Sequence, residues 1–228
     1  MGNRIIVINP NSSTEVTSGI DRALDDFRGD RDDEIECLTL AEGPPGIETQ
    51  RHVDGVVMPL CRLVESQDNR ASAFVIACYS DPGLHAVRET TAKPVFGIAE
   101  SGLLTALTLG DQVGVIAILP ASIPRHARFM RSLGIDGRVA GELAVGLGVT
   151  ELSNEAVTLG RMTEIGRRLR DEKGADVLVM GCAGMARYRA RLEDTLDLPV
   201  VDPTQAAVGM AITATRLGYR TGARHAAP

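Results

Sequence analysis

Short apolar runs rich in valine and isoleucine recur along this chain, and stretches with helical periodicity separate them. An unbroken apolar run fits a strand buried on both faces, so the alternation predicts parallel sheets covered by helices. The candidate strands are residues 4–9, 34–40, 73–78, 94–98, 112–118, 176–181 and 199–202. The candidate helices are Val53 to Glu65, Ala121 to Leu133, Asn154 to Lys173 and 204 to about 217. The sequence therefore predicts an α/β fold.

Three landmarks of the first half return in the same order in the second half. Cys78 and Cys182 are 104 residues apart (78 to 182), and each follows an apolar run. The other matched pairs are Pro94-Val95 with Pro199-Val200, and the segment 4–12 with the segment 112–122. Chance similarity between β-rich segments is the alternative explanation. Because order and spacing agree, we predict an internal duplication with two pseudosymmetric parallel-sheet α/β units and the active site in the cleft between them.

The repeat also suggests where the chain divides. We expect residues 1–98 plus 204–228 to form the first unit and residues 99–203 the second, with the last helix folded back onto the first. No linker rich in glycine or serine marks this boundary. The tail from Thr221 to Pro228 is expected to be disordered.

Cys78 and Cys182 are the leading catalytic candidates. Each follows an apolar run and precedes a predicted helix, where the helix dipole and free backbone N–H groups would stabilise a thiolate. Taken singly, a buried structural cysteine is the default interpretation, and Cys37 and Cys61 fit it. Asp81-Pro82 is expected to start the helix after the first thiol, and glycines flank the second thiol. Together these contexts favour a catalytic pair at the carboxyl ends of parallel strands, where ligands bind in such folds.

Asn11 is a further candidate, because Asn9-Pro10-Asn11-Ser12 follows the first strand. Ser12 and Glu15 have the spacing of a capping box, so Asn11 and Ser12 could simply cap a helix. The compatible functional interpretation is that the Asn11 amide holds a carboxylate or an imide carbonyl of a ligand.

Composition excludes several classes of partner. The net charge is −6 and no basic stripe is present, which argues against nucleic acid. No apolar stretch approaches membrane-spanning length, and the first strand begins too early for a signal peptide. Four cysteines without a secretion signal indicate reduced thiols in the cytoplasm. We expect a cytoplasmic protein with a small-molecule substrate, no membrane or nucleic-acid partner, and a homo-oligomeric state.

No sequence motif indicates a binding site for a cofactor or a metal. The chain has no Cys-x-x-Cys or His-x-x-x-His spacing, and its four histidines are scattered. A dinucleotide fingerprint, a phosphate loop and a serine nucleophile elbow are also absent. The sequence therefore predicts no bound cofactor and no metal.

Several segments of the chain together match the pattern of a known family. The chain resembles the aspartate/glutamate racemase superfamily, and within it the hydantoin and allantoin racemases. The matching segments span nearly the whole chain: Ile8-Asn9-Pro10-Asn11-Ser12-Ser13, Gly43-Pro44-Pro45-Gly46-Ile47-Glu48, Ala77 to Leu84, Arg88-Glu89, Pro94 to Glu100 and Gly181-Cys182-Ala183-Gly184-Met185. The resemblance implies two α/β units around a cleft and cofactor-independent proton transfer at a carbon next to a carbonyl. It also implies that Asn11, Ile47, Tyr79, Ser80, Ala117, Ile118 and Ala183 contact the substrate.

The chain departs from the racemase pattern after the fifth strand. Those enzymes usually carry two threonines there, whereas this chain reads Ala117-Ile118-Leu119-Pro120. We therefore expect an apolar wall and a substrate bulkier or less polar than allantoin, such as an alkyl- or aryl-substituted hydantoin.

The predicted function is cofactor-independent racemisation of 5-substituted hydantoins or a related carbonyl-activated stereocentre. One cysteine, as thiolate, would remove the proton, and the other would return one from the opposite face. Backbone N–H groups after both cysteines, with Asn11, would stabilise the enolate. Other superfamily chemistry remains open: an amino-acid racemase, a decarboxylase or a cis–trans isomerase would use one cysteine. A binding protein without catalysis is the third possibility.

Overall fold

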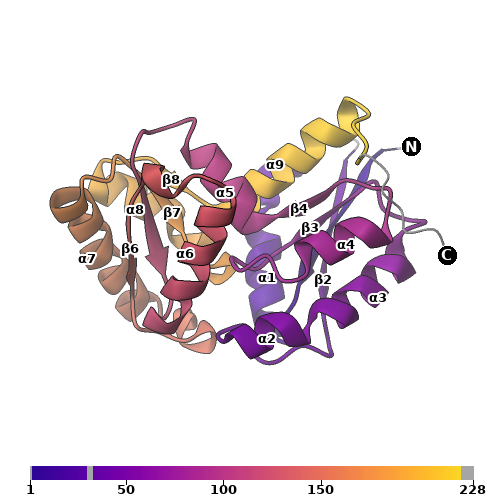
Figure 1. The fold of residues 1–228 in the computed structure, drawn as a ribbon, viewed down its shortest axis with the longest axis horizontal. Helices are drawn as coiled ribbons and strands as arrows, with labels where there is room; N and C mark the ends of the chain where they lie inside the picture. Colours follow the sequence, from indigo (N-terminus) through magenta and orange to yellow (C-terminus); the bar gives the residue numbers. More distant parts are fainter. Residues whose placement is uncertain (1, 30–32, 222–228) are drawn as a thin grey trace.

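Two four-stranded parallel sheets form the framework, in a computed structural model that describes residues 2–29 and 33–221. The first sheet has the order β2-β1-β3-β4 and the second has the order β6-β5-β7-β8. The strands are β1 (Arg4–Asn9), β2 (Glu34–Thr39), β3 (Ala73–Ile76), β4 (Val95–Gly97), β5 (Val113–Ala117), β6 (Val139–Ala144), β7 (Val177–Met180) and β8 (Val200–Val201). The matching strand orders agree with an internal duplication, and Figure 1 shows the two sheets in separate halves.

Helices cover both faces of each sheet, as the apolar strands predict. On the first sheet, α2 (Gln50–Gly55), α3 (Val57–Gln67) and α4 (Leu84–Thr90) pack on one face. The helices α1 (Thr14–Ala23) and α9 (Pro203–Arg216) pack on the other face. The chain therefore returns to the first sheet after completing the second (Figure 1). Residues 222–228, included in the expected first unit, lie outside the described residues.

The second sheet is covered in the same way. The helices α7 (Glu155–Lys173) and α8 (Arg189–Leu196) pack on one face, and α5 (Ile98–Ala106) and α6 (Ile123–Ser132) on the other. Short 3₁₀ turns connect these elements: η1 (Asp25–Phe27), η2 (Pro120–Ser122), η3 (Asp136–Arg138), η4 (Val149–Ser153) and η5 (Ala183–Tyr188). Helices α5 and α9 contact each other where the two halves meet.

Two sequence expectations differ from the structure. The helix expected from Val53 to Glu65 is two helices, broken between Gly55 and Val57. Pro59 lacks the N–H that would bond to the carbonyl of Gly55, so the first helix cannot continue through it. The second difference is strand β6, which the sequence analysis missed because all of its residues are partly exposed and Gly141 and Glu142 interrupt its apolar pattern.

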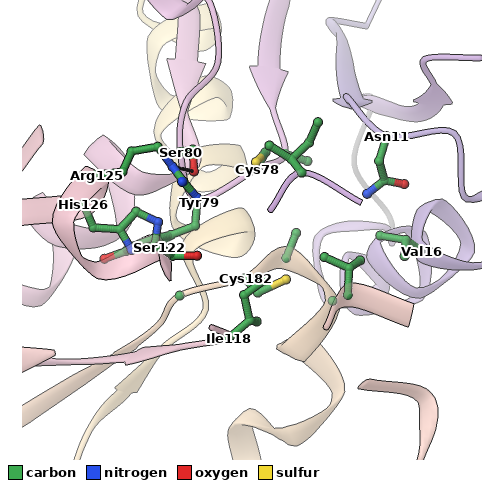
Figure 2. Close-up of a pocket in the computed structure, with 16 residues that line it drawn as sticks. Asn11, Val16, Cys78, Tyr79, Ser80, Ile118, Ser122, Arg125, His126 and Cys182 are labelled. Carbon is green, nitrogen blue, oxygen red and sulfur yellow. Dashed lines mark hydrogen bonds between the residues drawn. The ribbon is translucent and has the colours of Figure 1, made fainter. Parts of the chain in front are cut away.

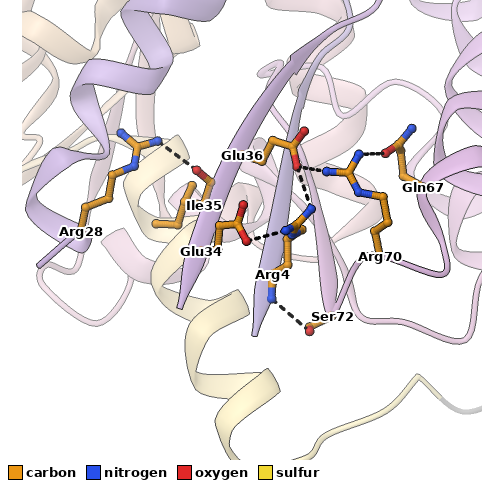
Figure 3. A network of polar contacts seen from close by, with 8 residues as sticks. All are labelled: Arg4, Arg28, Glu34, Ile35, Glu36, Gln67, Arg70 and Ser72. Carbon is orange, nitrogen blue, oxygen red and sulfur yellow. Dashed lines mark hydrogen bonds and ion pairs between the residues drawn. The ribbon is translucent and has the colours of Figure 1, made fainter. Parts of the chain in front are cut away.

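An ion-pair network marks the amino end of the first sheet (Figure 3). Arg4 pairs with Glu34 at 2.6 Å, and Arg70 pairs with Glu36 at 2.5 Å. Arg4 begins β1, so these pairs lie at the opposite end of the sheet from Asn9, the last residue of that strand. Partly exposed pairs of this kind contribute about 0–1 kcal/mol each, which makes them a minor contribution to stability.

Candidate active site

Cys78 follows β3 and lies in a loop that two hydrogen bonds hold in place. The N–H of Ala77 donates to Ile8 O of the neighbouring strand at 2.8 Å, and the N–H of Asp81 donates to Cys78 O at 2.9 Å. The Cys78 sulfur accepts a hydrogen bond from the backbone N–H of Ser80. Cys78 itself is partly exposed, and the loop directs it into a pocket between the two halves.

The expected helix start at Asp81-Pro82 is wrong. Helix α4 begins at Leu84 with Gly83 at its N-cap, in a left-handed conformation with φ of 67°. The Asp81 carboxylate instead accepts the N–H groups of Ala99 and Glu100 at 2.9 and 2.8 Å. It therefore caps α5, whose own N-cap residue is a glycine without a side chain to do so.

Cys182 occupies the equivalent place after β7. The N–H of Gly181 donates to Ile116 O of β5 at 2.8 Å, and a Cβ on Gly181 would lie 2.7 Å from that oxygen. A glycine is therefore required for the close approach that places Cys182. The Cys182 sulfur accepts the backbone N–H of Gly184, at the start of η5.

Both sulfurs line one pocket, and Figure 2 shows them coming from opposite sides of it. The enclosed part of the pocket has a volume of about 30 Å³, and the volume is about 420 Å³ when the opening to solvent is included. Of the residues expected to contact the substrate, these line it: Asn11, Ile47, Tyr79, Ser80, Ile118 and Ala183. Ala117 does not, because it is fully buried at the end of β5.

Burial opposes ionisation of both cysteines. Desolvation raises the pKa of Cys78 to about 12 and that of Cys182 to about 11, although each sulfur accepts one backbone N–H group that lowers the pKa. The expectation that helix ends would stabilise a thiolate is therefore not met: α4 starts six residues after Cys78, and only a short 3₁₀ turn follows Cys182. Burial therefore favours the thiol form of both groups at neutral pH.

Asn11 is fixed by its neighbours and keeps one donor available. Its Oδ1 accepts the N–H of Ser13 and the side-chain amide of Asn9, each at 2.9 Å. Its Nδ2 has no hydrogen-bond partner among the described residues and lies at the pocket (Figure 2). The helix cap expected at Ser12 is instead Ser13, whose hydroxyl accepts the N–H of Val16.

The Gly43 to Glu48 segment also contributes to the pocket. It brings Ile47 to the pocket, and a Glu48 carboxylate oxygen accepts the N–H of Val149 from the second half at 3.0 Å. This hydrogen bond joins the two halves beside the pocket. Val149 itself lines the pocket.

Sequence reasoning missed a polar wall formed by Ser122, Arg125 and His126. The Arg125 Nε donates to Ser80 Oγ at 3.1 Å, and His126 Nδ1 lies 2.5 Å from a Glu142 carboxylate oxygen. Their spacing of three and four residues places them on one face of a helix after β5, which is a signal that the sequence did contain. The expected apolar wall at Ile118 is therefore only part of that side. The other newly found lining residues are Val16, Ala77, Val149, Gly181 and Gly184.

Residues 2–29 and 33–221 contain no group of three or more His, Cys, Asp or Glu side chains that could hold a metal ion. None of the helices described there is long and apolar enough to cross a membrane.

Comparisons with known proteins agree with this architecture. Residues 5–211 match the family described as Asp/Glu/Hydantoin racemase. A hydantoin racemase of Pseudomonas sp. (strain NS671) is 34% identical over 223 residues, covering 96% of this chain and 88% of that protein. A hydantoin racemase of Paenarthrobacter aurescens is 33% identical over 221 residues, covering 96% and 93%. An allantoin racemase structure from Klebsiella pneumoniae superposes with a TM-score of 0.92 at 28% identity, covering 97% and 91%.

The fold, the pocket and these relatives define a racemase, that is, an isomerase. The chain belongs to the Asp/Glu/Hydantoin racemase family.

Proposed function

We propose that this enzyme racemises 5-substituted hydantoins, or a related compound whose stereocentre adjoins a carbonyl, with Cys78 and Cys182 as its two bases. One observation carries the proposal: the two thiols come from equivalent strands and enter one pocket from opposite sides (Figure 2). Inversion of a stereocentre needs a proton acceptor on one face and a proton donor on the other. The hydantoin and allantoin racemases to which the chain is similar act on ring compounds of this kind.

In the proposed reaction, one sulfur accepts a proton and the other sulfur donates one. One cysteine, as thiolate, takes the proton from the stereocentre, and the electron pair of the broken C–H bond moves into the neighbouring carbonyl to give an enolate. The other cysteine, as thiol, gives its proton to the same carbon from the opposite face. The two sulfurs have then exchanged protonation states, and proton exchange with solvent restores the starting form.

The high pKa values have two opposing effects on this step. At pH 8 the thiolate fraction is on the order of 10⁻³ to 10⁻⁴ for groups with such pKa values. The thiolate that does form is a stronger base than one in water, which favours removal of a weakly acidic C–H proton. The enzyme therefore combines a rare thiolate with a high intrinsic basicity.

Hydrogen-bond donors beside the substrate stabilise the enolate. The backbone N–H groups of Ser80 and Gly184 lower the pKa of the two thiols, so they also favour the thiolates. Asn11 Nδ2 is the donor that remains for a carbonyl or enolate oxygen. A preorganised donor of this type contributes roughly 3 kcal/mol to transition-state stabilisation.

The test is NMR-detected exchange of the stereocentre proton in D₂O on single enantiomers of several 5-substituted hydantoins, allantoin, aspartate and glutamate. Exchange with loss of optical purity on the hydantoins supports the proposal. Exchange confined to aspartate or glutamate would favour an amino-acid racemase, and no exchange on any compound would contradict racemisation of these substrates.

A further inference from the structure

Arg125 carries a positive charge into the pocket without a carboxylate to balance it. No carboxylate in residues 2–29 and 33–221 lies within 4.0 Å of the Arg125 guanidinium, although this arginine lines the pocket. Its single hydrogen bond runs from Nε to the hydroxyl of Ser80, the second residue after Cys78. Both terminal nitrogens of the guanidinium therefore have no partner among the described residues.

The position of Arg125 makes this arrangement costly. The side chain is partly buried at the pocket, and this burial removes part of its hydration. A desolvated cation without a counter-charge destabilises the protein, unless a ligand supplies the opposite charge or water hydrates the cation. A guanidinium with two open N–H groups matches the geometry of a carboxylate, which can bind it through two parallel hydrogen bonds.

The nearby charges do not cancel this cation. Glu142 on the same wall acts on Arg125 through its charge, but it lies beyond 4.0 Å from the guanidinium, and one of its oxygens contacts His126 Nδ1 at 2.5 Å. Asp81 lies near the Cys78 loop, but its two oxygens accept the backbone N–H groups at the start of α5. Arg128 on the same helix adds positive charge, and its Nη2 donates to Gln50.

Ser122 gives a second, independent indication that a polar ligand group binds at this wall. Its hydroxyl is buried and has no hydrogen-bond partner among the described residues, although the side chain lines the pocket. Buried hydroxyls are normally hydrogen-bonded, so an unpartnered hydroxyl beside the ligand space indicates a group that the ligand supplies. Ser122 and Arg125 are one helical turn apart and line the same side of the pocket (Figure 2).

We propose that Arg125, with Ser122, binds an anionic group on the side chain of the substrate, so that the preferred substrates are cyclic ureides with a carboxylate on the 5-substituent. This inference rests on the proposed function, and it replaces the less polar side chain expected from the sequence with an anionic one. Ile118 lines the same pocket, so it offers an apolar surface to the methylene part of such a side chain. The carboxylate itself is held by the guanidinium.

The experiment compares hydantoin-5-acetate with hydantoin-5-acetamide, which has nearly the same shape but no charge. Wild-type enzyme is expected to have a kcat/KM at least tenfold higher for the acid. Arg125→Gln should raise KM for the acid at least tenfold and bring the ratio of kcat/KM for the acid to kcat/KM for the amide close to one. Arg125→Lys should recover part of the preference, since it keeps the charge but not the two-point contact. Arg128→Gln, on the same helix outside the pocket, is the matched control and should preserve the preference.

Equal losses for the acid and the amide in Arg125→Gln would overturn the proposal, because Arg125 would then act on Cys78 rather than on the substrate. Binding to a Cys78→Ser/Cys182→Ser variant, measured by calorimetry, separates this proposal from the racemase reaction. Tighter binding of the acid that depends on Arg125 supports the anion site even if wild-type enzyme exchanges neither compound. Equal binding of the acid and the amide contradicts it even if both are racemised.

Discussion

The carboxylate of Asp81 lies against Gly97, and a Cβ on Gly97 would be 2.3 Å from the Asp81 Cγ. Asp81 has a positive φ of 40° and ties the Cys78 loop to the start of α5. The corresponding helix of the second half, α9, is capped by its own N-cap residue, Asp202. The two halves therefore achieve the same cap differently, and only in the first half does the cap hold the thiol loop.

Replacing Asp81 with asparagine is expected to affect stability and activity together. Asparagine tolerates the positive φ but accepts through one oxygen, so one N–H group at the start of α5 loses its acceptor. We expect the free energy of unfolding to fall by about 1 kcal/mol and kcat/KM to fall at least tenfold, since the Cys78 loop loses an anchor. Urea unfolding and a racemisation assay measure the two effects.

Asn154→Ala is the matched control for this prediction. Asn154 caps α7 by accepting the N–H of Val157 and does not itself line the pocket. Its loss should lower stability by a similar amount and leave kcat/KM unchanged. A reduced kcat/KM in Asn154→Ala, equal to that of Asp81→Asn, would show that the activity loss reflects stability alone.

The pH dependence of the reaction follows from the buried thiols. Burial raises the pKa of Cys78 to about 12 and of Cys182 to about 11, so raising the pH from 7 to 10 increases the thiolate fraction. We expect kcat/KM to rise close to tenfold per pH unit in this range for an N3-methylated hydantoin, whose ring imide cannot ionise. A flat profile between pH 7 and 9 would mean that the base is already ionised.

The high pKa values of the two thiols affect how the rate of their alkylation by iodoacetamide is interpreted. Slow reaction with iodoacetamide near neutral pH would favour a binding protein if the helix ends activated both thiols. Because burial makes both groups neutral, slow alkylation of the free enzyme is now expected for an active racemase as well. An alkylation rate that rises with pH would indicate that the thiolate forms of the two cysteines are accessible and reactive.

Ile118 tests the departure from the usual racemase pattern. Ile118→Thr places a hydroxyl at the pocket, where it can hydrogen-bond a polar substrate group. We expect the ratio of kcat/KM for allantoin to that for 5-isobutylhydantoin to rise about tenfold. Ile118→Val has the shape of threonine without the hydroxyl and is the control. Equal ratios in the two variants would contradict a role for polarity at this position.

The central strands were predictable because short apolar runs, rich in Val and Ile, form them. Cys78 and Cys182 come directly after such strands. The repeat, together with the rule that ligands bind at the carboxyl ends of parallel strands, therefore predicted that both cysteines lie in one cleft. Strand β6 was not predictable in this way, because an edge strand with one open side does not need a continuous apolar run.

The polar wall was missed for a different reason. Tyr79 comes from the first half, whereas His126 and Glu142 come from α6 and β6 of the second, and the ring centroids of Tyr79 and His126 are 5.1 Å apart. The helical spacing of Ser122, Arg125 and His126 was present in the sequence, but no spacing relates that wall to its neighbours Tyr79 and Glu142. The pKa shifts of the two thiols could not be predicted from the sequence either, because the burial of the thiols depends on how closely the two halves approach each other.

The most direct test of the account is deuterium exchange by Cys78→Ser and Cys182→Ser, each given single enantiomers of a racemised hydantoin in D₂O. The account predicts that neither variant racemises the substrate and that each exchanges the proton of one enantiomer only, a different enantiomer in each variant. Cys37→Ser, which changes a thiol in β2 outside the pocket, should racemise normally. Racemisation at the wild-type rate by either active-site variant would contradict the two-thiol mechanism.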